Sequence, residues 1–131
     1  MLKAISMATI EAILDALPGD LTFIDETDTV KYYNKVDKSE EKIFPRKPED
    51  IGSKVQDCHK PENVPEVNRI LNELKSGKRS VIEGWTDSNG RKIYESYPAV
   101  RDKTGKYLGM LVFTKDMTEL LKMSTKQGGK K

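Results

Sequence analysis

The chain has 131 residues, of which 36% are hydrophobic, and this length suits a single domain with a buried core. The net charge is only +2, so no basic excess argues for a partner nucleic acid. No apolar run approaches the roughly 20 residues of a membrane span. Residues 1–17 lack a signal-peptide core and the single cysteine excludes an internal disulfide, so we expect a cytoplasmic protein.

The first part of the chain predicts a helix followed by a hairpin. Apolar residues at helical spacing indicate a helix over residues 6–17, with Ser6 as its cap. Two short apolar segments, residues 21–25 and 30–34, are separated by a polar turn. Together these two segments predict an antiparallel hairpin.

The middle of the chain predicts mostly irregular backbone followed by one long helix. Residues 35–50 are charged and rich in proline, and a residue before proline avoids the helical region. We expect a short helix around residues 39–43 and one helical turn over residues 51–55. The clearest helix spans residues 64–76, where Pro65 suits the first turn and the apolar residues form one stripe.

The last part predicts three antiparallel strands and the start of a helix. Asn89-Gly90 is a two-residue hairpin turn between a strand over residues 79–87 and a strand that ends near Val100. A polar turn then leads into an apolar strand over residues 107–115. Asp116 would cap the following helix, and Glu119 would reach back to the backbone.

These elements predict an α+β fold with a five-stranded antiparallel sheet and helices covering one face. Residues 1–19 would form an N-terminal flanking helix and residues 20–116 the core. Residues 117–131 would hold the start of an output helix and a disordered tail.

This order of elements resembles a PAS domain, the sensor module of histidine kinases and many other regulators. The motifs that carry the resemblance are Gly90-Arg91, Val100-Arg101-Asp102, Gly105 and Asp116-Met117-Thr118-Glu119. The last of these looks like the Asp-Ile-Thr signature that ends PAS cores. Three middle segments look like the PAS subtype that accompanies hemerythrin-like domains in prokaryotes: Phe44-Pro45-Arg46, Ile51-Gly52 and Cys58-His59-Lys60-Pro61.

The resemblance implies a small-molecule or prosthetic-group pocket between the sheet and the long helix, with Asp116, Thr118 and Glu119 relaying the signal. Strand alternation leaves open which way two carboxylates point. For Glu83 we favour a side chain that points into water. For Glu95 the resemblance favours a side chain that points into the pocket. Ordinary core packing is the alternative for each residue of the implied pocket wall, which comprises Tyr33, Ile70, Leu74, Trp85, Glu95, Tyr97, Leu111 and Phe113.

Cys58 and His59 are the only cysteine and the only histidine, and both residue types can ligate a metal. In haem-binding PAS domains an axial histidine comes from this neighbourhood, so the resemblance implies haem as a candidate cofactor. The alternative is a local structural role, with His59 bonding the loop and Cys58 acting as a small buried hydrophobe.

Three functions stay open at this point. The first is a non-catalytic sensor that binds a small molecule, the second a haem-based gas or redox sensor using Cys58 and His59, and the third a ligand-free dimerisation module. An apolar face on the helix over residues 6–17 leads us to expect a homodimer through this helix or the sheet. The chain has no Ser-His-Asp order and no phosphate-binding loop that would indicate an enzyme.

Overall fold

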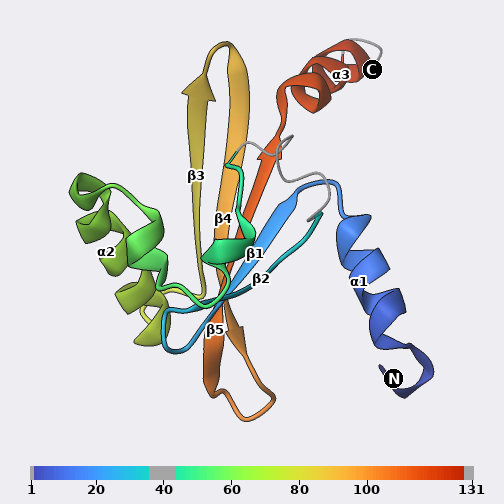
Figure 1. Ribbon diagram of the computed structural model, residues 1–131. Coiled ribbons are helices and arrows are strands. Elements are labelled where there is room, and N and C mark those ends of the chain that lie inside the picture. Colours follow the sequence, from blue (N-terminus) through green and yellow to red (C-terminus); the bar gives the residue numbers. More distant parts are fainter. Residues whose placement is uncertain (1, 36–43, 129–131) are drawn as a thin grey trace.

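The computed structural model describes residues 2–35 and 44–128, and it contains one antiparallel sheet with the strand order β2-β1-β5-β4-β3 (Figure 1). This is the predicted α+β fold with five strands. The predicted helix near residues 39–43 lies outside the described residues. The helices and strands are α1 (Met7–Asp15), β1 (Asp20–Asp25), β2 (Val30–Tyr33), α2 (Val64–Lys75), β3 (Val81–Ser88), β4 (Arg91–Arg101), β5 (Tyr107–Asp116) and α3 (Thr118–Gly128).

The predicted capping and turn residues have the expected conformations at the ends of these elements. Ser6 caps α1, with its Oγ accepting a bond from the Thr9 N–H at 3.1 Å. Asn89 and Gly90 have φ angles of 51° and 81°, as a tight hairpin turn between β3 and β4 requires. None of the described helices is long and apolar enough to cross a membrane.

The predicted helical turn over residues 51–55 is wrong. The Gly52 N–H donates to the Val30 carbonyl at 2.8 Å, and the Val55 N–H donates to the Asp28 carbonyl at 2.8 Å. These backbone groups therefore bond the β1–β2 hairpin and are not available for a helix of their own. Three short 3₁₀ turns lie on either side of this contact: Pro48–Asp50, Val55–Cys58 and Pro61–Asn63.

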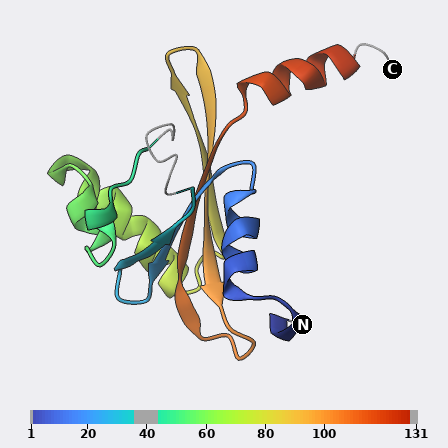
Figure 2. The same ribbon diagram turned by 45° about the vertical axis from the view of Figure 1, so that its right-hand side comes forward.

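The sheet has a helix on each side. Helix α2 and the 3₁₀ turns lie over one face, and α1 lies against the other, as both views show (Figure 2). The main core is on the α2 side, where six buried side chains form one cluster: Ile24, Val30, Val55, Leu71, Leu74 and Met110. We refer to these two sides of the sheet as the α2 face and the α1 face.

Candidate functional site

A cavity of about 830 Å³ lies between the α2 face of the sheet and the segment that leads into α2. Much of its wall is apolar, because α2 and β5 turn aliphatic side chains toward each other. The apolar residues of the described wall include Val55, Val67, Ile70, Met110 and Val112.

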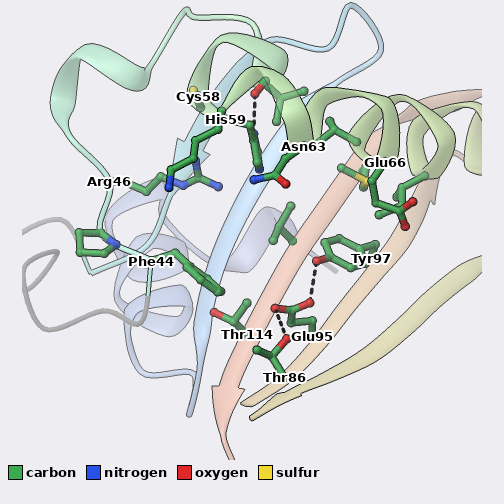
Figure 3. Close-up of a pocket in the computed structure, with 17 residues that line it drawn as sticks. Phe44, Arg46, Cys58, His59, Asn63, Glu66, Thr86, Glu95, Tyr97 and Thr114 are labelled. Carbon is green, nitrogen blue, oxygen red and sulfur yellow. Dashed lines mark hydrogen bonds between the residues drawn. The ribbon is translucent and has the colours of Figure 1, made fainter. Parts of the chain in front are cut away.

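The floor of the cavity carries a hydrogen-bonded carboxylate. The Tyr97 hydroxyl donates to Glu95 Oε2 at 3.0 Å, and Thr86 Oγ1 donates to Glu95 Oε1 at 3.3 Å (Figure 3). Burial, together with the nearby Glu95 charge, raises the pKa of Tyr97 far above its ordinary value. Tyr97 therefore stays protonated, so its hydroxyl can go on donating to Glu95.

The opposite wall presents basic and amide side chains from the segment before α2. Arg46, His59 and Asn63 project from this wall, and the Arg46 Nε donates to Thr22 Oγ1 at 3.3 Å (Figure 3). The cavity thus has a carboxylate on its floor and two cationic side chains, Arg46 and Lys60, on the facing wall.

His59 is held by its own loop. Its Nδ1 lies 2.9 Å from the Val55 carbonyl oxygen. Because a carbonyl can only accept, Nδ1 carries the proton, and Nε2 is left with its lone pair when the ring is neutral.

Cys58 is held in the same turn, with its Sγ 3.6 Å from the Lys54 carbonyl oxygen. Burial, with the negative charge of Asp50, raises the pKa of the Cys58 thiol, which disfavours the thiolate that ligates metals. Among residues 2–35 and 44–128 no group of three or more His, Cys, Asp or Glu side chains could hold a metal ion.

A family model described as PAS domain matches residues 10–118 of the chain. The chain belongs to the PAS domain family. PAS domains of sensor histidine kinases are among the solved structures that share its fold.

Solved structures agree with this assignment. The crystal structure of a C-terminal domain from Streptococcus mutans is 30% identical, with a TM-score of 0.85, and covers 91% of this chain and 90% of that chain. The PAS domain of BvgS from Bordetella pertussis is 16% identical, with a TM-score of 0.65, over 95% of this chain and 98% of that chain. A Vibrio cholerae structure described as the Aer2 receptor, a dual PAS-heme oxygen sensor, is 16% identical, with a TM-score of 0.53, over 76% of this chain and 95% of that chain. No curated protein matched the sequence.

The PAS fold does not place all the predicted pocket residues around the cavity. Ile70, Glu95 and Tyr97 lie on its wall, and their role in binding stays a prediction. Tyr33 and Leu74 are buried in the core and do not line the cavity.

The predicted placement of Trp85, Leu111 and Phe113 is wrong. Paired residues of an antiparallel ladder share one face, and Trp85 pairs with Tyr94 on the α1 face, where the indole is 59% exposed. On β5 the alternate residues Met110, Val112 and Thr114 line the cavity, so Leu111 and Phe113 point to the α1 face. Glu83 also lies on that face, exposed and accepting a bond from the Tyr94 hydroxyl, which is the orientation that the sequence favoured.

Several wall residues were not predicted. Met110, Val112 and Thr114 could not be chosen over their neighbours, because β5 carries apolar residues on both of its faces. Arg46 comes from irregular backbone and Asn63 from a 3₁₀ turn of three residues, and in neither does a periodic pattern indicate the direction of a side chain.

The start of α3 is tied to the start of β4. Asp116 Oδ1 accepts bonds from the Thr118 N–H at 3.0 Å and the Thr118 hydroxyl at 2.6 Å. The Lys92 N–H donates to Thr118 Oγ1 at 2.9 Å, and the Met117 N–H donates to the Lys92 carbonyl at 2.8 Å. Glu119 pairs with Lys122 at 3.6 Å in place of the predicted bond back to the backbone.

Proposed function

We propose that this PAS domain is a non-catalytic sensor that binds a small molecule in the cavity between the sheet and α2. The supporting observation is the cavity itself, whose volume of about 830 Å³ falls within the range of small-molecule sites. An apolar wall with a few placed polar groups is the usual composition of such sites. A cytoplasmic location, which the single free cysteine favours, is part of the same proposal.

A native mass spectrum of the purified protein should show the chain with the added mass of a bound small molecule. Ile70→Trp should reduce this bound fraction about tenfold or more, because forcing a larger side chain into a packed site costs about 1–3 kcal/mol. Ile51→Trp is the matched control, since Ile51 is exposed and lies outside the cavity wall. Equal occupancy in both variants, or a bare chain in the wild type, would contradict the proposal.

Haem is a second candidate ligand, and the supporting observation is the tautomer of His59. A histidine that donates Nδ1–H to a backbone carbonyl presents Nε2 in the way that metal-ligating histidines commonly do. The raised thiol pKa makes Cys58 the weaker candidate ligand. When bound, haem would supply an iron centre that binds gases or changes oxidation state.

The same mass spectrum distinguishes haem from a metabolite. A haem adduct with a Soret band that His59→Ala abolishes and Cys58→Ala retains would support the haem sensor. A bound metabolite without such a band would rule that candidate out.

We further propose that a binding signal leaves through the junction of β4 and α3. Strand β4 carries Glu95 in the cavity and, three positions earlier, Lys92, whose backbone bonds Met117 and Thr118. A ligand that favours one position of β4 would thereby favour one position of the start of α3.

Asp116→Asn should weaken this junction, since the hydrogen bonds from Thr118, together with the charge of Arg91, hold the pKa of Asp116 below its ordinary value of 3.8. We expect the local folding equilibrium of the first turn of α3 to fall about twofold to fivefold at neutral pH. Wild-type protein should show the same loss as pH falls. A lowered folded-state pKa means that the contribution is complete above the unfolded pKa and disappears as pH falls through the folded pKa.

The measurement is the ¹³Cα chemical shifts of residues 118–121. Asp102→Asn is the control, because Asp102 makes the same bonds to Thr104 in the distant β4–β5 turn. A change in α3 of equal size in both variants would count against the junction.

A homodimer through α1 and the α1 face of the sheet is also part of the proposal. Apolar side chains are exposed there, namely Met7 and Ile13 on α1 and Val81 and Trp85 on β3. The mass spectrum reports the assembly as well as the ligand. A dimer without any ligand would favour the third function, a dimerisation module.

A further inference from the structure

Glu95 is a carboxylate on a largely apolar part of the cavity floor, and it has no cationic partner among the described residues. None of the ion pairs among the described residues includes it, and its two bonds come from the neutral hydroxyls of Tyr97 and Thr86. Glu66, at another part of the wall, differs because Arg69 neutralises it at 2.5 Å. Of these two acidic residues on the cavity wall, Glu95 is therefore the one whose charge a ligand could pair with.

The two hydroxyls orient the carboxylate but do not saturate it. A carboxylate has about four lone-pair sites, so two donors leave acceptor capacity facing the cavity. Neutral donors also offset only part of the cost of removing a charge from water. A ligand group beside Glu95 must be a donor, and a cationic N–H group gains most because charge-assisted hydrogen bonds are the strongest.

The rest of the cavity defines the remainder of the ligand. Met110 and Val112 lie on the same floor and Val67 and Ile70 lie on α2, so an apolar body fits between them. The basic groups Arg46 and Lys60 belong to the wall that comes from the segment before α2. They would repel a cation at that wall, so the positive end of a ligand is directed toward Glu95.

We propose that the cavity binds a protonated amine on an apolar body, with the nitrogen at Glu95. This inference rests on the proposed small-molecule site and adds the chemical class of its ligand.

Three probes with the same phenylethyl body test the proposal: phenethylamine, phenethyl alcohol and hydrocinnamate, which carry an ammonium, a hydroxyl and a carboxylate. Each is titrated into the ¹⁵N-labelled full chain at neutral pH, and affinities are taken from amide shifts of the cavity residues. We expect the amine to bind about tenfold tighter than the alcohol, because a hydrogen bond to a charged group outweighs a neutral one by about this factor. The carboxylate should bind weakest.

Glu95→Gln should abolish the preference for the amine. Its amide oxygen still accepts a bond from one of the two hydroxyls, and its amide nitrogen can donate to the oxygen of the other. Glu83→Gln is the matched control, because Glu83 also accepts a bond from a tyrosine but lies on the α1 face. This control should keep the wild-type preference. The three-probe comparison on the wild type stands by itself if the Glu95 variant fails to fold.

Each outcome decides the proposal. Tighter binding of the carboxylate than of the amine, or a preference for the amine that survives Glu95→Gln, overturns the amine class. In both cases the proposed site stands, because the probes still bind in the cavity. If no probe shifts any cavity amide and the native mass spectrum shows a bare chain, the proposed function and this inference both fail.

Discussion

Replacing Gly109 with alanine should lower the free energy of unfolding by about 3–5 kcal/mol, which combines backbone strain with overpacking. Gly109 lies on β5 opposite Asp25 of β1 with a φ angle of 153°. An added Cβ would lie 2.9 Å from the Asp25 Cα and would overlap the Ile24 carbonyl oxygen. Both contacts are with backbone, so the two central strands would have to move apart.

Gly90→Ala provides the comparison for Gly109→Ala. Gly90 also has a positive φ angle, but nothing lies within 4 Å of an added Cβ. Its replacement by alanine should therefore lower the free energy of unfolding by only about 1–2 kcal/mol, which is the cost of backbone strain alone. Urea unfolding of both variants measures the difference, and an equal loss in the two would show that β1 and β5 can move apart without a cost in stability.

Asn34→Ala should destabilise the fold by about 2–4 kcal/mol, because it leaves buried backbone groups without their partner. Asn34 is fully buried, and its Oδ1 accepts a bond from the Leu21 N–H at 2.8 Å. Its Nδ2 donates to the Leu14 carbonyl at 2.8 Å and the Gly19 carbonyl at 3.3 Å. The Asn34 side chain thus links the end of α1 to the first hairpin through hydrogen bonds.

Asn72→Ala makes the same chemical change at an exposed position of α2. It should leave stability within about 0.5 kcal/mol of the wild type, as surface substitutions usually do. If the two asparagine variants unfold at the same urea concentration, the Asn34 hydrogen bonds do not stabilise the attachment of α1. A loss confined to the Asn34 variant, together with changed α1 amide signals, is the expected result.

The sequence alone predicted the fold well because its signals are local. Asn89-Gly90 specifies a tight turn whatever lies around it, and Ser6 needs only the following turn to cap α1. The helix over residues 64–76 carries its apolar stripe within its own length, and α2 spans Val64–Lys75. The order of such elements, together with the motifs from Gly90-Arg91 to Asp116-Met117-Thr118-Glu119, indicated the PAS family.

The wall of the cavity was predicted less well. Which alternate side chains of a strand face the cavity depends on how the whole sheet is packed. Strand β5 lies between β1 and β4 and only its last residue is exposed, so its apolar residues do not alternate with polar ones. The wrong alternate set, Leu111 and Phe113, was therefore assigned to the cavity. On β4 strand alternation left the direction of Glu95 open as well, and it was the resemblance to PAS domains that favoured the cavity, where Glu95 lies.

The contacts between distant segments were decided only by the tertiary structure. The sequence determined the long helices, the five strands and the hairpin turns, because capping, periodicity and turn chemistry act over a few residues. It could not show that residues 52–55 bond the first hairpin or that Lys92 holds the start of α3. Nor could it show that Glu95 lacks a cationic partner among the described residues, since that depends on which side chains from separate elements meet in space.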